Sequence, residues 1–214
     1  MAKRRQPPIT IVDGDADTAQ IAEFERDRRE LLRRGIAAGG AVVAASSIPL
    51  LLSVRKAFAA QEGDLGILES AIKLERVAVL AYDTLIDRGL LSARVERVAK
   101  LFLAQEQEHA DELVAALTAL RGTVPPKPAG VKDIDDVVEG IGDVKSQADV
   151  LHFAIELETS AVAAYYDASR ELVDAKLLQT AASIMANEGQ HLVVLRQAAG
   201  KPPVPHALET GEEE

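Results

Sequence analysis

Two glutamate–histidine pairs stand at the same spacing in two distant parts of this 214-residue chain. Glu106 and His109 form the first pair, and Glu188 and His191 form the second pair 82 residues further along. Residues three apart lie on one face of a helix, so each pair presents a carboxylate beside an imidazole. Such ligand atoms suit iron, manganese and zinc. A single pair also fits an ordinary solvated helix face, and the repetition is therefore the informative feature.

A further glutamate precedes each pair. Glu75 lies 31 residues before Glu106, and Glu158 lies 30 residues before Glu188. All of these acids fall on stripes of apolar residues at three- and four-residue spacing, which predicts that they face a helical core. No lysine or arginine lies on the same stripes. An unpaired buried carboxylate is costly enough to take up a proton, and four together repel one another.

Two divalent cations would remove this excess of negative charge, because they balance four carboxylates, and two neutral imidazoles would complete the site. The predicted ligands are Glu75, Glu106, His109, Glu158, Glu188 and His191. Hard oxygen ligands mixed with imidazole favour iron first and manganese second, whereas zinc usually takes fewer ligands. The sequence therefore predicts a dimetal site, and a metal-free relic of such a site is the alternative.

Four amphipathic segments carry these residues and predict an all-α fold. They cover about 64–88, 92–121, 146–171 and 174–199. Short connections near Gly89 and Asp174 make each successive pair of helices an antiparallel hairpin, and the Pro- and Gly-bearing segment 123–145 is a long crossover between the hairpins. Two antiparallel helical hairpins joined by one long crossover form the ferritin-like four-helix bundle. An internal repeat supports this topology, because LERVAVLAYD at 74–83 matches LETSAVAAYY at 157–166.

With this ligand set, the chain resembles the ferritin-like superfamily of dimetal carboxylate proteins, which includes rubrerythrin and bacterioferritin, over 64–199. The resemblance implies that Glu75 and Glu158 are ligands from the two helices without a ligand histidine. The spacing does not tell which glutamates bridge two metals and which bind one. Tyr82 and Tyr165 follow these glutamates by seven residues. They resemble tyrosines that hydrogen-bond a ligand carboxylate from across the bundle, and simple packing is the alternative.

The same resemblance implies an oxidoreductase that handles iron, O₂ or H₂O₂ in stress protection, with ferroxidase, peroxidase or catalase-like activity. The alternative is a metal-binding or structural stress protein without turnover. A storage cage is disfavoured, since the chain ends in a Pro-rich polar tail rather than a fifth helix. The chain has no cysteine. It therefore lacks a rubredoxin-type relay, and any electron donor must be a separate protein. A homodimer is compatible with the sequence, which does not determine the oligomeric state.

The N-terminal residues 1–59 read as an export signal. The stretch Arg28-Arg29-Glu30-Leu31-Leu32-Arg33 resembles a twin-arginine (Tat) motif, a weakly apolar run follows at 36–54, and Ala57-Phe58-Ala59 is typical of a cleavage site. A retained transmembrane anchor is the alternative. We therefore expect export by the Tat translocase to a periplasmic or other extracytoplasmic space, with membrane contact only through the signal region. The ferritin-like domain would then occupy 60–200, followed by a disordered acidic tail at 201–214.

Composition limits the remaining classes of function. The chain is 48% hydrophobic and 27% charged, as expected for one globular domain. Its net charge of −10 argues against nucleic-acid binding, which requires a basic face. The absence of cysteine excludes disulfides, thiolate zinc sites and iron–sulfur centres.

Overall fold

The computed structural model describes residues 63–211. The predicted signal region, including the twin arginines and Ala57-Phe58-Ala59, lies outside the described residues. Within 63–211 the regular structure is entirely helical, as predicted. No helix in this range is both long enough and apolar enough to cross a membrane.

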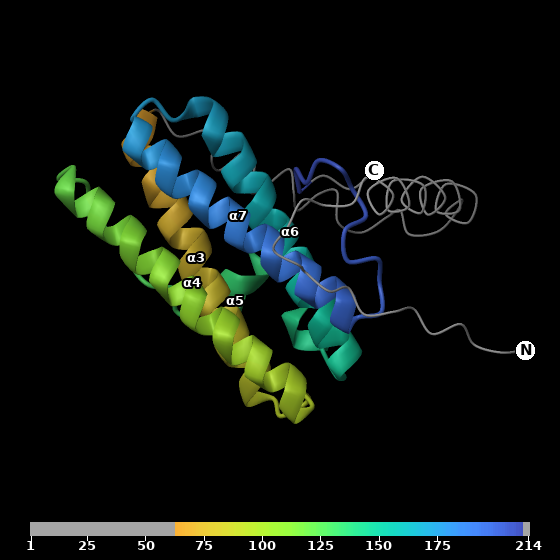
Figure 1. Ribbon diagram of the computed structural model, residues 1–214. Coiled ribbons are helices and arrows are strands. Elements are labelled where there is room, and N and C mark those ends of the chain that lie inside the picture. Colours follow the sequence, from red (N-terminus) through yellow and green to blue (C-terminus); the bar gives the residue numbers. More distant parts are fainter. Residues whose placement is uncertain (1–62, 212–214) are drawn as a thin grey trace, which may run out of the picture. The chain divides into compact units, whose positions relative to one another are not determined.

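Two helical hairpins build the fold (Figure 1). The first consists of α3 (Gly63–Asp87) and α4 (Ala93–Ala119), and the second consists of α6 (Gln147–Glu171) and α7 (Ala175–Ala198). Gly89, at φ 66°, reverses the chain after α3, in a backbone conformation that favours glycine. The Asp174 carboxylate accepts hydrogen bonds from the backbone N–H groups of Lys176 and Leu177 at 2.8 and 3.1 Å and so caps α7. These local signals explain why the helix boundaries lie within two residues of the predicted ones.

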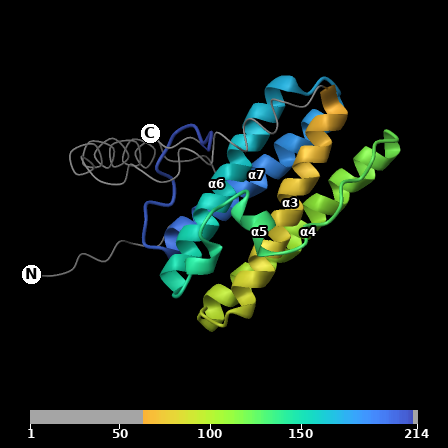
Figure 2. The same cartoon turned by 180° about the vertical axis from the view of Figure 1, so that it is seen from behind.

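The crossover between the hairpins contains regular structure that its Pro- and Gly-bearing composition does not predict. It contains the short helix α5 (Val131–Asp135) and the 3₁₀ turn η1 (Ile141–Asp143). α5 packs against α3 (Figure 2). Ile134, Val138 and Ile141 are fully buried there. Their spacing of four and three residues is the helical signal that marks this segment in the sequence.

Two apolar clusters occupy the core, and the predicted ligands interrupt the helices where one cluster gives way to the other. On α7, Ile184 belongs to one cluster and Leu192 to the other, with Glu188 between them. On α4, Phe102 and Leu113 flank Glu106 in the same way. A polar layer therefore crosses the middle of an otherwise apolar bundle.

The end of the segment 201–211 differs from the predicted disordered tail, because the structure places residues 209–211 against the bundle. Arg196 on α7 is largely buried, and its Nη1 donates to Glu209 Oε2 at 2.6 Å. Gly211 is buried at φ 68° against the backbone of Thr159 and Ala163, where a Cβ atom would not fit. A buried guanidinium requires an anionic partner, and Glu209 supplies one. Composition alone does not show this pairing.

Candidate metal centre

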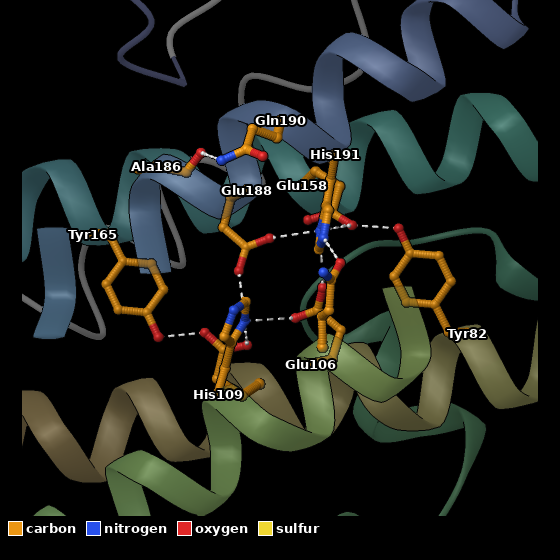
Figure 3. A network of polar contacts seen from close by, with 11 residues as sticks. Tyr82, Glu106, His109, Glu158, Tyr165, Ala186, Glu188, Gln190 and His191 are labelled. Atoms are coloured by element: carbon orange, nitrogen blue, oxygen red, sulfur yellow. Dashed lines mark hydrogen bonds and ion pairs between the residues drawn. The ribbon is translucent and has the colours of Figure 1, made fainter. Parts of the chain in front are cut away.

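All six residues predicted as ligands converge in the middle of the bundle, and all four long helices contribute (Figure 3). They are Glu75 on α3, Glu106 and His109 on α4, Glu158 on α6, and Glu188 and His191 on α7. Each of the four glutamates is at most 2% exposed. The structure thus brings together side chains that are up to 116 positions apart in the sequence.

These residues form two overlapping groups, each able to surround one cation. One group is Glu75, Glu106, His109 and Glu188, and the other is Glu106, Glu158, Glu188 and His191. Within each group the candidate ligand atoms lie within 4.8 Å of one another. Glu106 and Glu188 belong to both groups, so these two are in position to bridge a pair of ions, while Glu75 and Glu158 each face one.

The two carboxylate oxygens of each shared glutamate point to different histidines. Glu188 Oε1 lies 3.0 Å from His109 Nδ1, and Glu188 Oε2 lies 3.0 Å from His191 Nδ1. Glu106 Oε1 lies 3.1 Å from His191 Nδ1, and its Oε2 lies 3.5 Å from His109 Nδ1. Each shared carboxylate therefore has one oxygen directed to each half of the site, as the two-fold repeat of the hairpins requires. A carboxylate that bridges two cations needs this arrangement.

Several polar atoms at this centre are buried and lack a hydrogen-bond partner among residues 63–211. They are Glu106 Oε1, His109 Nδ1, both carboxylate oxygens of Glu188, and His191 Nδ1. Leaving buried polar atoms unsatisfied is costly, and native proteins do so rarely. Because the atoms converge and are all lone-pair donors when deprotonated, divalent cations fit the residues present.

Two tyrosines hold the outer glutamates from the opposite hairpin. The Tyr82 hydroxyl on α3 donates to Glu158 Oε1 on α6 (Figure 3). The Tyr165 hydroxyl on α6 donates to Glu75 Oε1 on α3. Burial, together with the nearby carboxylates, raises the pKa of both tyrosines well above the usual value, so both remain protonated donors. The reciprocal geometry favours the hydrogen-bonding role over simple packing.

The two histidines have different surroundings although the repeat relates them. His191 is 1% exposed, stacks on Phe102 with ring centroids 3.9 Å apart, and its Nε2 lies 2.8 Å from Gln105 Oε1. The side chain of His109 is 12% exposed and lines an open pocket of about 450 Å³ together with Glu108 and Glu112. The candidate metal centre is thus closed on the His191 side and accessible on the His109 side.

Gln105 was not predicted as a site residue, because it lies off the apolar stripe of α4. Its role becomes visible only in the structure, where it contacts His191 on α7. A hydrogen bond from Nε2–H to the amide oxygen assigns Nδ1, which faces Glu106, Glu158 and Glu188, as the nitrogen that would lose its proton to a cation. Partners of this kind orient a ligand imidazole and fix its tautomer.

Replacing Gln105 by alanine is expected to weaken metal binding in the His191 group by about 10–100-fold, the usual cost of losing such a partner. Isothermal titration calorimetry with Mn²⁺ measures the effect. Asn187 is the matched control, since it occupies the equivalent place in the second hairpin and no hydrogen bond joins it to His109 among the described residues. Equal losses in Gln105→Ala and Asn187→Ala would contradict the orienting role of Gln105.

Without a cation, protons neutralise the centre. Burial opposes a charge on either histidine, but contacts with Glu106, Glu188 and a third glutamate outweigh it and raise the pKa of His109 and His191 to about 12. Burial also raises the pKa of Glu75 and Glu158 well above the usual value. For Glu188, contacts with both histidines overcome the effect of burial and lower the pKa to about 2. In the metal-free protein, protons on the histidines and the outer glutamates thus take the place of the cations.

The bundle topology and the carboxylate–histidine centre define a ferritin-like protein. The chain matches the ferritin-like domain family over residues 63–201 and belongs to that family. It is also similar to the crystal structure of a conserved hypothetical protein, Rv2844, from Mycobacterium tuberculosis, with 18% sequence identity and a TM-score of 0.56. That similarity covers 74% of this chain and 99% of the other, and it concerns the fold alone. No curated protein matches the chain.

Proposed function

We propose that this chain is an exported dimetal carboxylate protein that carries out redox chemistry on iron, O₂ or H₂O₂ in protection against oxidative stress. The observation that carries the proposal is the pair of overlapping ligand groups that share Glu106 and Glu188. Iron is the expected metal and manganese the second choice, because the ligands are hard oxygens with one imidazole per ion. When bound, two such ions supply electrons for the reduction of O₂ or peroxide.

The residues of the chain have separate tasks in this proposal. Glu106 and Glu188 would be shared by the two ions, while Glu75 with His109 and Glu158 with His191 would complete the ligands of each. The apolar clusters above and below the centre exclude bulk water. Tyr82 and Tyr165 keep the outer carboxylates in place through their hydroxyl groups.

Access to the centre supports a small polar substrate. The pocket beside His109 is lined by Glu108, Glu112, Gln179, Thr180, Ser183 and Ile184. Two exposed carboxylates at its rim attract cations such as Fe²⁺, and the hydroxyl groups suit peroxide or water. On the opposite side the stacked Phe102 and His191 rings block a comparable approach.

The proposal includes partners that follow from the chain itself. Electrons would come from a separate donor protein, because the chain has no cysteine to hold an iron–sulfur or rubredoxin-type centre. Export would require the Tat translocase, and membrane contact would be limited to the signal region. Nucleic acid is not an expected partner at a net charge of −10. A homodimer is the assembly we propose to test first.

The decisive experiment is anaerobic loading of the protein with Fe²⁺, followed by rapid mixing with O₂ or H₂O₂ while ferric iron is monitored by its near-ultraviolet absorbance. Oxidation faster than that of free Fe²⁺ and repeated over several additions of Fe²⁺ supports the redox function. The Glu106→Ala/Glu188→Ala double mutant is expected to return the rate to that of free Fe²⁺. Tight binding without accelerated oxidation by either oxidant would instead establish a metal-binding protein without turnover.

Export provides a separate prediction. Replacing Arg28 and Arg29 by lysine is expected to leave the precursor in the cytoplasm, because the Tat pathway requires the arginine pair. Cell fractionation and immunoblotting measure the distribution. Replacing Arg4 and Arg5, an arginine pair outside this motif, by lysine is the matched control and is expected to leave export unchanged. Unchanged export of the Arg28→Lys/Arg29→Lys variant would exclude the Tat route.

A further inference from the structure

An apolar cavity of about 340 Å³ is lined by Tyr82 but by none of the six candidate metal ligands, and it has no part in the function proposed above. All four long helices contribute to its wall. Small side chains such as Val98 on α4, Ala154 on α6 and Ala198 on α7 meet there, and they leave the space between the two hairpins unfilled. A volume of this size falls in the range of about 300–1,000 Å³ that is usual for small-molecule sites.

The lining of the cavity carries positive charge and no negative charge. Arg94 is the only charged residue of its lining, and no carboxylate contributes to it. Arg94 is exposed, and among residues 63–211 it forms neither an ion pair nor a hydrogen bond. An unpaired guanidinium at an apolar opening is notable in a chain with a net charge of −10. Guanidinium groups recognise carboxylates and related anions through paired hydrogen bonds.

We propose that this cavity binds a small amphiphile with an unbranched apolar chain and an anionic head group, of which a medium-chain carboxylate is the simplest example. The apolar chain lies between the hairpins against Val98, Leu151 and the ring of Tyr82, and the carboxylate pairs with Arg94 at the opening. A long-chain lipid would extend beyond a cavity of about 340 Å³, and Arg94 would repel a cationic amphiphile. The site does not depend on the proposed redox function.

The inner end of the cavity lies one side chain away from the metal centre. Tyr82 lines the cavity, and its hydroxyl is hydrogen-bonded to Glu158. The bound chain therefore packs on the residue that positions one of the outer carboxylates. The cavity is separate from the polar pocket at His109, with which it shares no lining residue.

The test is calorimetric titration of the full-length, metal-free protein with hexanoate, octanoate and decanoate below their micellar concentrations. Affinity is expected to rise about fourfold for each added methylene group until the cavity is full, as apolar burial requires. Octanoate is expected to bind about two- to fivefold more tightly than octanol, as for an exposed ion pair. Arg94→Gln should remove that difference, whereas Arg97→Gln, on the same helix but outside the lining, should retain it.

Filling the cavity is the second arm of the test. Val98→Phe is expected to abolish binding, and Ala182→Phe, at an exposed position outside the lining, should leave it unchanged. If Val98→Phe does not fold by circular dichroism, Ala198→Phe at the exposed rim replaces it. The proposal would be overturned if octanoate showed no saturable binding to the wild type. It would also be overturned if the cavity-filled variants bound octanoate as tightly as the wild type does. A concentration-dependent dimer that excludes octanoate in sedimentation velocity would also overturn it, and would assign this face to a second copy of the chain.

Discussion

Anaerobic addition of Fe²⁺ or Mn²⁺ to the metal-free protein is expected to raise its melting temperature, and by more than Mg²⁺ does. Ions that bind only the folded state stabilise it by about 4 kcal/mol at a thousandfold excess over Kd. For a domain of this size that corresponds to a shift of roughly 8–16 °C. Mg²⁺ should have less effect, because it prefers an octahedral oxygen shell and keeps its waters. Differential scanning calorimetry under argon measures the shift.

The Glu75→Gln/Glu158→Gln double mutant is expected to lose this response, because each metal group then lacks one anionic ligand. The matched control is Glu139→Gln/Glu171→Gln, which removes two exposed carboxylates and should keep the full response. A wild-type melting curve indifferent to all three metals would contradict the dimetal site and leave the fold without a demonstrated cation.

The same measurement should depend on pH in a defined direction. In the metal-free protein, the pKa of both histidines rises from 6.5 to about 12, and the pKa of Glu75 and Glu158 rises above 4.5. The folded metal-free state therefore binds more protons than the unfolded state, and its stability falls as the pH rises from about 5. Metal ions displace these protons, so the metal-induced rise in melting temperature grows with pH. A rise that shrinks between pH 5 and 8 would contradict this proton–metal competition.

Loss of a shared glutamate is expected to cost both ions, whereas loss of an outer glutamate should cost about one. Glu106→Ala or Glu188→Ala removes a ligand from both groups, while Glu75→Ala or Glu158→Ala affects a single group. Elemental analysis after gel filtration in Mn²⁺-free buffer measures the retained metal. The expected ratios per chain are near zero for the shared positions and near one for the outer positions.

Asp111→Ala provides the control for this series, because Asp111 is exposed on α4 and belongs neither to a ligand group nor to the lining of the pocket beside His109. It should retain as much metal as the wild type. Equal losses at the shared and the outer positions would contradict the bridging geometry without contradicting metal binding itself.

The sequence alone determined the four long helices and the set of acids and histidines between them. Helix boundaries depend on local features, such as the turn at Gly89 and the cap at Asp174, which act within a few residues. A carboxylate such as Glu188 on an apolar stripe is equally visible, because helical periodicity shows which face is buried. The 82-residue offset between the two Glu-x-x-His pairs then shows that one hairpin occurs twice.

Only the tertiary structure decided how these side chains meet. Whether a glutamate is shared depends on the axial register of α4 against α7, which no local pattern encodes. The hydrogen bond between Gln105 and His191, the pairing of Arg196 with Glu209 and the cavity beside Arg94 each join elements distant in sequence. Helical periodicity fixes the face on which a residue lies, but the packing of the hairpins sets its partner. The difference between the buried His191 and the accessible His109 therefore appears only in the folded bundle.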